Sequence, residues 1–286
     1  MLTTRPSVRP LGIRPLKPGD LDVFLALTAQ DPVTNVFAEH RARASKLEPR
    51  WLAGEIWGRF DGDELRAACH VGANLVPIQA EPEDAIAFGR RVIERRNQIS
   101  TIFGQEVAVR AMYDVVSVGR PEPRGLRMCQ PHLELSSAPL IASDPAVRLS
   151  TKADFEVLFP ACVAMYTEEV GVSPVDGIGA QQYRTRVGQL INMGWSFVRI
   201  DQGRVVFKAE VACASPYAAQ IQGVYIAPDS RGQGIAAPAI AAVVRHVQAH
   251  IAPIASLYVN QWNLPARRAY ARCGFQRSGT FGTVLF

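Results

Sequence analysis

The sequence predicts an α/β (α+β) protein made of two domains, each with a mixed central sheet flanked by helices. Three observations support this fold class. The chain has 286 residues, which is too many for one ordinary hydrophobic core and enough for two. Strand and helix patterns follow one another in nearly the same order in both halves. Between the halves, residues 119–125 and 136–145 are rich in Pro, Gly and Ser, which predicts a boundary near residue 141.

The first half, residues 1–140, contains a full set of strand and helix patterns. Asp61-Gly62 is a turn pair between two strand-like runs, so a hairpin is expected there. Alternating and helical spacings of apolar residues identify the remaining elements. In chain order we expect a strand at 8–16, helices at 18–28 and 36–44, hairpin strands at 55–60 and 65–71, a strand at 74–79, a helix at 83–95, a strand at 99–103, a helix at 106–115 and a strand at 126–135.

The second half, residues 141–286, has clearer element boundaries. Apolar side chains recur at helical spacing after Asp154, and Gln202-Gly203 is a turn pair between two strand-like runs. Gly274 follows the last helix in the position of a C-cap. In chain order we expect a strand at 146–149, helices at 154–169 and 180–193, strands at 196–200, 205–214 and 218–226, a helix at 235–250, a strand at 256–260, a helix at 265–272 and a strand at 280–286.

The similar order of elements suggests a degenerate internal repeat. Residues 99–103 and 109–113 of the first half resemble residues 256–259 and 267–270 of the second. The first half lacks a Gly-rich turn between the strand expected at 74–79 and the helix expected at 83–95. The corresponding residues 79–83 read Gln-Ala-Glu-Pro-Glu, and their acidic side chains would repel a diphosphate. We therefore expect only the second half to bind a nucleotide.

Composition excludes several classes of protein. The five cysteines are odd in number and widely spaced, with no CxxC pair, so neither a disulfide framework nor a zinc site is expected. We expect all five to be buried apolar residues. The first twenty residues carry prolines and charges instead of a signal peptide, and no apolar run is long enough to span a membrane. Despite a net charge of +5, the Lys and Arg residues are scattered, which disfavours nucleic-acid binding. A cytoplasmic protein without a metal is expected.

The strongest chemical feature is the segment from Val224 to Ala236. A strand enters a turn with two glycines, Gly232 and Gly234, and a long helix follows. Free N–H groups and a partial positive charge at a helix N-terminus bind phosphate, and Arg231 adds a full charge beside them. The segment is neither a Walker loop nor the dinucleotide GxGxxG motif, because the required Lys and the required spacing are missing. Plain helix capping by the glycines is the alternative.

A second feature is the helix that begins near Asn263. Asn263 can cap this helix, and Pro265 suits its first turn. Asn263 and Tyr270 are seven residues apart, which is two helical turns, so both lie on one face. A buried tyrosine whose hydroxyl is hydrogen-bonded is the structural alternative to a functional Tyr270.

Together these two segments resemble the GCN5-related N-acetyltransferase (GNAT) superfamily. Its pattern is Arg/Gln-x-x-Gly-x-Gly/Ala followed by Asn-x-x-Ala-x-x-x-Tyr-x-x-x-Gly-Phe. The matching residues are Arg231, Gly234, Ala236, Asn263, Ala266, Tyr270, Gly274 and Phe275. The resemblance covers residues 146–286, and it implies a GNAT-type mixed sheet. The whole chain resembles an actinobacterial subgroup in which an uncharacterised domain of the DUF4081 type precedes a GNAT domain. This resemblance of the whole chain implies a tandem of a degenerate N-terminal GNAT-like domain and an intact C-terminal one.

The resemblance implies a function and a role for each residue. Acetyl-CoA would be the co-substrate, and a primary amine of a small molecule or protein would attack it directly. Pantetheine would lie against the strand end and contact Asn263, and Tyr270 would protonate the departing thiolate, since thiol and phenol pKa values of roughly 8.5 and 10 permit the transfer. A non-catalytic acyl-CoA sensor is the alternative, and a homodimer is left open. The expected cofactor-binding residues are Val224, Tyr225, Ile226, Arg231, Gly232, Gln233, Gly234, Ile235, Ala236 and Asn263.

The identity of the general base stays open. Many family members place a Glu early in the strand at 218–226, but this chain has Gln220 and Gln222 there, and neither amide is a base. Glu210 on the neighbouring strand is the substitute candidate. Lys208 shares its face by strand alternation, so an ion pair is the competing interpretation. Otherwise a water chain carries the proton, or the amine binds already neutral.

Two further carboxylates end the first helix of the second half. Glu168 and Glu169 lie beside the loop that covers the acceptor site in this family, where they could attract a cationic amine. A solvated helix end is the plainer interpretation, although acidic residues at a helix C-terminus are mildly unfavourable.

Overall fold

The computed structural model describes residues 12–177 and 179–286, so residues 8–11 of the first expected strand lie outside it. Contacts divide the chain into two compact units. The first unit runs to Pro131 and includes Gly279–Phe286, and the second unit comprises His132–Ser278. This division differs from the expected domains 1–140 and 141–286. It differs because the C-terminal strand forms its ladder within the first unit.

The second unit follows the expected order of elements. Its sheet has the strand order β6-β11-β10-β9-β8-β7, and β10–β11 is a parallel pair in an otherwise antiparallel arrangement. The elements are the end of β6 (Gly125–Leu135), β7 (Arg148–Leu149), α6 (Phe155–Val170), α7 (Ala180–Asn192), β8 (Ser196–Asp201), β9 (Arg204–Ala214), β10 (Ala218–Ile226), α8 (Ala236–His250), β11 (Ile254–Tyr258) and α9 (Leu264–Cys273). Short 3-10 turns precede α6 (η2, Lys152–Asp154) and α8 (η3, Pro228–Ser230).

Helices cover both faces of this sheet. Alternate residues of β9, including Phe207 and Val211, pack in one cluster with apolar residues of α8 and α9. A second cluster joins Leu158 of α6 and Val187 of α7 to Val198 of β8. Because side chains of a strand point alternately to its two faces, Lys208 and Glu210 lie on the α6 and α7 side. The strand β9 therefore separates two layers of helix.

Local sequence accounts for the hairpin and the helix ends. Gln202 and Gly203 both have positive φ, as a two-residue hairpin turn matched to strand twist requires. Gly171 and Gly274 end α6 and α9 in the left-handed conformation. These turns fix where each strand and helix stops, and so position the loops at the strand ends.

The first unit repeats this architecture. Its strand order is β1-β2-β3-β4-β5-β12-β6, with β4–β5 parallel. Helix α3 was not expected, because a single turn shows no helical periodicity. The elements are β1 (Gly12–Pro15), η1 (Pro18–Asp20), α1 (Leu21–Thr28), α2 (Val36–Ser45), α3 (Pro49–Leu52), β2 (Gly54–Asp61), β3 (Glu64–Gly72), β4 (Asn74–Ile78), α4 (Pro82–Glu94), β5 (Thr101–Gln105), α5 (Glu106–Val116), β6, and most of β12 (Gln276–Leu285).

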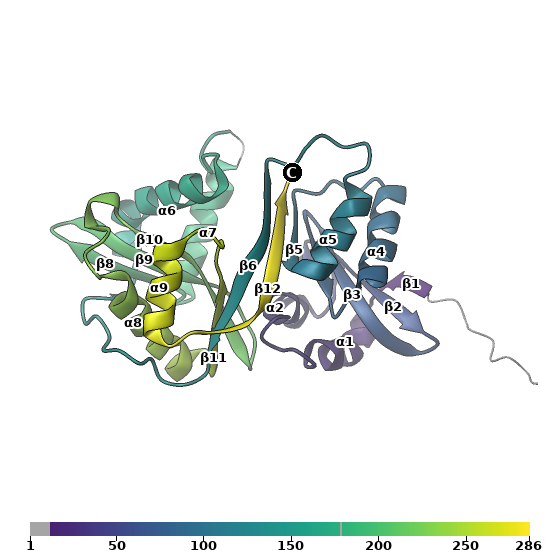
Figure 1. The fold of residues 1–286 in the computed structure, drawn as a ribbon, viewed down its shortest axis with the longest axis horizontal. Helices are drawn as coiled ribbons and strands as arrows, with labels where there is room; N and C mark the ends of the chain where they lie inside the picture. Colours follow the sequence, from purple (N-terminus) through teal and green to yellow (C-terminus); the bar gives the residue numbers. More distant parts are fainter. Residues whose placement is uncertain (1–11, 178) are drawn as a thin grey trace, which may run out of the picture. The chain divides into compact units, whose positions relative to one another are not determined.

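The C-terminal strand completes the first unit. Residues 281–285 of β12 pair antiparallel with residues 101–105 of β5, and Figure 1 shows the two strands side by side. Thr283 donates a hydrogen bond from its hydroxyl to Gln130 of β6 at 2.7 Å. The strand β12 therefore lies between β5 and β6. This position explains why Gly279–Phe286 belongs to the first unit, although it follows the expected boundary at residue 141.

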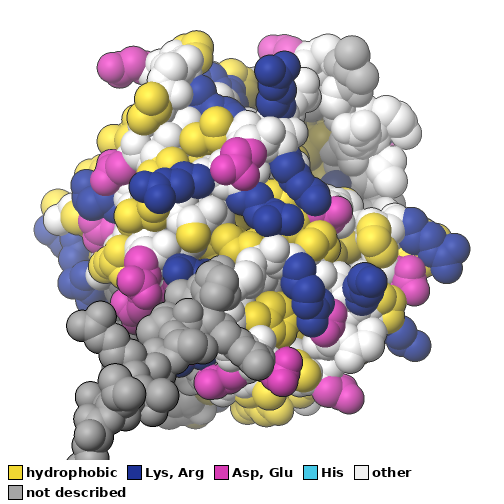
Figure 2. Space-filling view, turned by 90° about the vertical axis from the view of Figure 1, so that its right-hand side faces the viewer, with side chains coloured by type: hydrophobic (Ala, Val, Ile, Leu, Met, Phe, Trp, Pro, Cys, Tyr) yellow, Lys and Arg dark blue, Asp and Glu magenta, His cyan; other side chains and the backbone are white. Residues whose placement is uncertain are grey.

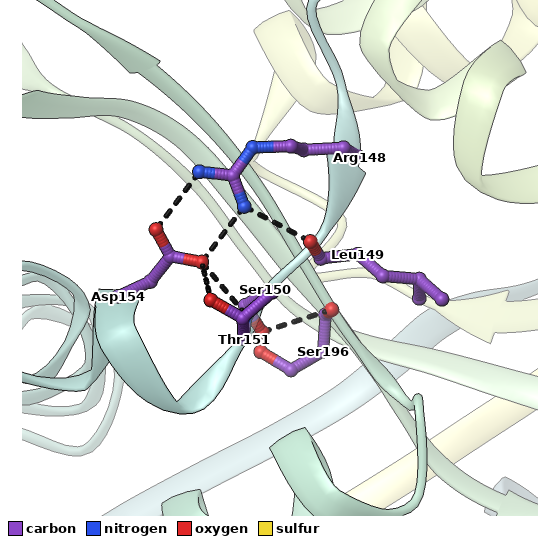
Figure 3. A network of polar contacts seen from close by, with 6 residues as sticks. All are labelled: Arg148, Leu149, Ser150, Thr151, Asp154 and Ser196. Atoms are coloured by element: carbon purple, nitrogen blue, oxygen red, sulfur yellow. Dashed lines mark hydrogen bonds and ion pairs between the residues drawn. The ribbon is translucent and has the colours of Figure 1, made fainter.

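An ion pair at the start of each unit marks the repeat. Figure 3 shows Arg148 donating two hydrogen bonds to Asp154, at 2.7 and 2.8 Å. Arg14 donates two bonds of 2.7 Å to Asp20 at the same spacing in the first unit. In both units the backbone N–H three residues before the aspartate also donates to it. The shared geometry supports an internal repeat.

The register of the central strands repeats as well. The β2–β3 pairing shifts between Arg59 and Phe60, and the β8–β9 pairing shifts between Arg199 and Ile200. Counting from these shifts, Ala68 corresponds to Lys208 and His70 corresponds to Glu210. These correspondences allow the two units to be compared residue by residue.

Cys129 corrects the expectation that all five cysteines are buried. Its side chain is exposed, whereas the other four are buried. A φ of 60° interrupts the alternation of β6 at this residue, and the thiol lies 3.6 Å from a carboxylate oxygen of Glu106.

One face of the molecule mixes charges of both signs. Figure 2 shows one face on which Lys and Arg side chains lie among Asp, Glu and apolar side chains. Among residues 12–177 and 179–286, every helix is too short or too polar to cross a lipid bilayer.

Candidate functional site

The strand β10 contains a bulge in the second unit. Gln222 pairs with Glu210 and Tyr225 pairs with Lys208, so Gly223 and Val224 lie opposite a single residue of β9. Gly223 has a φ of 59°, and a Cβ there would come within 3.0 Å of the Lys208 Nζ and 3.1 Å of the Glu210 Cδ. Only glycine fits this position without strain, because both the backbone angle and the neighbouring ion pair exclude a side chain.

The two parallel strands separate beside this bulge. The ladder between β10 and β11 joins Ala218, Ala219 and Gln220 to their partners and ends there. Beyond the bulge, the expected ligand contacts Tyr225 and Ile226 continue to pair with β9 on the other side, while Val224 lies in the bulge itself. The edge of β10 that faces β11 is thereby available to a ligand that hydrogen-bonds like an added strand.

The turn after β10 leads directly into the N-terminus of α8. Gly232 and Gly234 have φ values of 77° and 78°, and a Cβ at either position would meet nothing within 4 Å. Ile235 is the N-cap of α8 and Ala236 its first residue. Among the described residues, none accepts a hydrogen bond from the N–H groups of residues 232 to 236. The turn therefore leaves main-chain donors without a protein partner in an exposed segment, as an anion site requires.

Hydrogen bonds to nearby carbonyl oxygens hold the side chains of two turn residues, Gln233 and Arg231. The Gln233 side chain donates to the Asp229 carbonyl oxygen at 3.1 Å. Arg231 donates through Nε to the Ile226 carbonyl oxygen at 3.0 Å, and its guanidinium lies over the Tyr225 ring. Arg231 thus bridges the end of β10 and the start of the turn.

The structure places Asn263 and Tyr270 on α9 as expected. Asn263 caps the helix, because its side-chain oxygen accepts a hydrogen bond from the Ala266 N–H at 3.2 Å. Tyr270 is buried and packs edge-on against Phe275. Among the described residues, none is hydrogen-bonded to the Tyr270 hydroxyl. Burial, and secondarily the charge of Glu169, raises the Tyr270 pKa, so the phenol stays protonated at neutral pH.

Glu210 belongs to a buried polar network on the opposite layer. Its Oε2 accepts a hydrogen bond from the Lys208 Nζ at 2.8 Å, and its Oε1 accepts one from the Gln222 amide at 2.9 Å. Lys208 is fully buried. Burial is the largest influence and opposes its charged form, but the Glu210 carboxylate and the Cys162 side chain together outweigh burial and raise the Lys208 pKa. Lys208 and Glu210 therefore form an ion pair beneath the bulge.

The sequence did not predict the bulge or the role of Gln222 as a donor to Glu210. The glycine between Gln222 and Val224 was the available signal, since glycine inside a strand often marks a bulge. No group of three or more His, Cys, Asp or Glu side chains placed to hold a metal occurs in the described part of the chain.

Two family models match the chain. The model of the acetyltransferase (GNAT) family matches residues 193–275, which run from the start of β8 to the end of α9. The model of a domain of unknown function (DUF4081) matches residues 54–158, which begin at β2 and end within α6. The second half therefore carries a GNAT acetyltransferase domain, and a DUF4081 domain precedes it. No curated protein matches the chain.

Several solved structures share the fold over nearly the whole chain. A GNAT-family acetyltransferase from Colwellia psychrerythraea is 15% identical, with a TM-score of 0.58, covering 96% of this chain and 99% of that one. A GCN5-related N-acetyltransferase from Sphaerobacter thermophilus is 15% identical, with a TM-score of 0.59 and coverages of 98% and 96%. A tandem GNAT protein from the clavulanic acid biosynthesis pathway is 15% identical, with a TM-score of 0.54 and coverages of 96% and 98%.

These comparisons establish the fold class and the general activity class. The fold is the expected mixed α/β arrangement, and a tandem GNAT protein shares it. The GNAT family, which uses acetyl-CoA as a co-substrate, supports an acyl-CoA-dependent N-acetyltransferase in general.

Proposed function

We propose that the second unit transfers an acetyl group from acetyl-CoA to a primary amine of a small molecule or protein by direct attack. The proposal rests on one arrangement of three consecutive features. The strand β10 is bulged, its ladder with β11 stops at Gln220, and the turn that follows is open and has unpaired N–H groups. Acetyl-CoA is long and flexible, with a diphosphate between its adenosine and its pantetheine arm and a thioester at the far end of that arm. The open turn fits the diphosphate, and the exposed strand edge fits the amide groups of pantetheine.

The residues that would hold acetyl-CoA follow from this fit. The unpaired N–H groups of residues 232 to 236 would bind the diphosphate, and the Arg231 side chain would add its charge. The edge of β10 at residues 224–226 would hydrogen-bond pantetheine. The side-chain oxygen of Asn263 already caps α9, which leaves its amide nitrogen to donate to the same ligand. Acetyl-CoA itself supplies an activated thioester carbonyl.

Two groups would serve the reacting end of the site. A main-chain N–H released from pairing at the bulge would stabilise the negative charge that develops on the thioester oxygen. Tyr270 would donate its hydroxyl proton to the departing thiolate, because burial keeps the phenol protonated until that step and also disfavours the charged thiolate beside it.

Glu210 would accept the proton that the attacking amine must lose. An alkyl ammonium group has a pKa near 10.4, so a base is required at neutral pH. Lys208 and Gln222 each donate to a different oxygen of Glu210. A carboxylate has about four lone-pair positions, so two remain for the amine. The two hydrogen bonds fix the orientation of the Glu210 side chain.

Release of free thiol from acetyl-CoA in the presence of a panel of primary amines tests this function. We expect sustained thiol release with at least one amine, and a decrease of about a hundredfold in Glu210→Gln, the typical contribution of a general base. The near-isosteric amide should leave acetyl-CoA affinity nearly unchanged. Tight binding of acetyl-CoA without turnover of any amine would instead indicate a non-catalytic sensor.

A further inference from the structure

The first unit contains an open cavity at the C-terminal end of α4. Its volume is about 550 Å³, which lies within the usual range for small-molecule sites. The lining consists of Ile93, residues 96–100 and Arg120. The counterpart of the proposed diphosphate turn lies at the other end of α4, before Pro82. The cavity is therefore a separate feature of the first unit.

The positive charge of this cavity has no counter-ion within the described part of the chain. Among residues 12–177 and 179–286, none forms an ion pair with Arg96 or Arg120, and the Arg120 guanidinium lies 5.9 Å from the centre of the Phe286 ring. None of the lining residues is acidic. Nearby arginines outside the lining have partners: Arg91 the Trp57 ring, Arg95 the Glu55 carboxylate and Arg124 the Phe286 carbonyl oxygen.

The same lining offers further hydrogen-bond donors and apolar surface. Within the described residues, the Gln98 amide and the Ser100 hydroxyl have no hydrogen-bond partner, and the N–H groups of Gln98 and Ile99 have no acceptor. Ile93 and Ile99 add apolar side chains. The cavity thus combines two guanidinium groups, neutral donors and an apolar wall, which suits an organic anion.

The backbone of Arg96 also distinguishes this position. Arg96 follows the last residues of α4 with a φ of 53°, a conformation that glycine or asparagine usually takes at a helix end because a larger side chain is strained there. The N–H groups of Arg96 and Asn97 donate to the Ile93 and Val92 carbonyl oxygens, at 2.9 and 3.2 Å. These carbonyl oxygens at the negative end of the helix dipole are thereby satisfied, which lowers their repulsion of an anion.

We propose that this cavity binds an organic phosphate monoester, whose phosphate pairs with Arg96 and Arg120 and whose apolar body packs against Ile93 and Ile99. The inference is independent of the proposed function, because all these residues belong to the first unit. A phosphate monoester carries a charge of about −1.5 to −2 at pH 7, which matches two guanidinium groups, whereas a carboxylate carries a single charge. The planar guanidinium also fits phosphate oxygens through two parallel hydrogen bonds.

Calorimetry of the full chain with phenyl phosphate, inorganic phosphate and benzoate tests the class of ligand. Inorganic phosphate lacks the apolar body, and benzoate lacks the second charge. We expect saturable binding of phenyl phosphate at one site per chain, about tenfold tighter than either other probe and weaker in high salt. Absence of saturable phenyl phosphate binding, or equally tight binding of benzoate or inorganic phosphate, would overturn the proposal.

Two arginines at the end of α4 provide a matched pair of variants. Arg96→Gly should keep or raise the melting temperature, since glycine takes a φ of 53° without strain, and should weaken phenyl phosphate binding about tenfold or more. Arg90→Ala removes the same charge from an exposed residue of α4 outside the lining and should stay within about twofold of the wild type. Equal losses in the two variants would reveal unspecific attraction by charge and refute the site.

A third variant separates this cavity from the turn of the second unit, which also suits phosphate. Arg231→Gln should keep phenyl phosphate binding, and Arg96→Gly should keep acetyl-CoA binding. Loss of phenyl phosphate binding in Arg231→Gln, with normal binding in Arg96→Gly, would place the probe in the second unit and contradict the proposal. A chain that binds phenyl phosphate through Arg96 but does not bind acetyl-CoA would refute the proposed function alone.

Discussion

The two units differ most at the N-terminus of one helix, which is α4 after β4 in the first unit and α8 after β10 in the second. In the first unit, the Glu81 N–H donates to the Asp84 carboxylate at 3.0 Å, and Asp84 also pairs with Arg59. Acidic side chains of the protein thus occupy the start of α4. In the second unit, the turn before α8 contains two glycines and Arg231. A Cβ added at either glycine would meet no atom within 4 Å, so the start of α8 is open. The same fold element is internally neutralised in one unit and available to an anion in the other.

The strand before that helix differs in the same direction. In the first unit, β4 pairs with β3 without a bulge, and a Cβ at Gly104 of β5 would lie 3.6 Å from Pro77 of β4. The two parallel strands therefore stay close where β10 and β11 separate. Pro77 also lacks the N–H that a ligand would need. The first unit keeps the sheet but closes the opening that would admit pantetheine.

The polar network of the second unit is replaced by packing in the first. The counterparts of Lys208 and Glu210 are Ala68 and His70. The His70 ring packs edge-on against Phe37, and burial lowers the pKa of His70, which favours its neutral form. We therefore expect a few residues on a shared scaffold to decide whether a unit binds acetyl-CoA.

The largest expected effect breaks the open turn. Gly234→Asp places bulk, strain and negative charge where we propose the diphosphate binds, and should weaken acetyl-CoA affinity by a hundredfold or more by calorimetry, on the order expected for losing several charge-assisted bonds. Gly119→Asp is the control in the first unit, because Gly119 has a φ of 74° and equally open surroundings. Normal binding by Gly234→Asp would show that the diphosphate lies elsewhere.

The next effect concerns the buried ion pair. Lys208→Met leaves the Glu210 carboxylate buried without its partner, and should lower the free energy of unfolding by about 3–5 kcal/mol. Chemical denaturation measures this loss. The double variant Lys208→Met with Glu210→Met restores an apolar pair and should recover most of the stability. A single variant as stable as the wild type would mean that Glu210 is not held by Lys208.

The same pair predicts a response to alkaline pH. Because the Lys208 pKa is raised in the folded state, the pair contributes its full stability below the unfolded pKa of about 10.4. That contribution is lost as the pH rises through the folded pKa. The wild type should therefore lose more stability than Lys208→Met above about pH 10.4 in denaturation series. Parallel pH curves for the two proteins would refute the raised pKa.

A smaller effect separates the two related tyrosines. Tyr270→Phe removes the proposed acid and should lower turnover about a hundredfold with little change in acetyl-CoA affinity. Tyr113→Phe alters the tyrosine in the corresponding helix α5 of the first unit and should leave turnover unchanged. Equal turnover in Tyr270→Phe and the wild type would exclude Tyr270 as the acid.

The smallest effect tests what the units share. An Arg14 hydrogen bond lowers the Asp20 pKa to about 2, and an Arg148 hydrogen bond also lowers the pKa of Asp154. Each pair contributes stability above the unfolded pKa of about 3.9, which is lost as the pH falls through the folded value. Asp20→Asn and Asp154→Asn should each cost about 1 kcal/mol at pH 7, and each cost should shrink as the pH falls toward the folded pKa, at a lower pH for Asp154 than for Asp20. Markedly unequal costs would argue against equivalent repeats.

Most of the fold could be predicted from the sequence because its elements carry strong local signals. The hairpin at Gln202-Gly203 and the helix end at Gly274 each depend on one recognisable residue pair or cap. The placement of β12 between β5 and β6 could not be predicted, since it depends on pairing between residues far apart in the chain. The single-turn helix α3 is too short to show a period.

The site was predicted less completely than the fold. The motif residues of the turn and of α9 were found because their spacing is local. The bulge at Gly223 depends on the register between β9 and β10, which no local pattern reveals. The pairing of Glu168 with Arg231 joins elements 63 residues apart and needed the folded structure.

The stoichiometry of acetyl-CoA binding tests the contrast between the units most directly. Isothermal titration of the wild-type chain should give one site per chain, competed by CoA and abolished in Gly234→Asp. Two equivalent sites per chain, or no binding of either acetyl-CoA or CoA, would contradict the assignment of a single nucleotide site to the second unit.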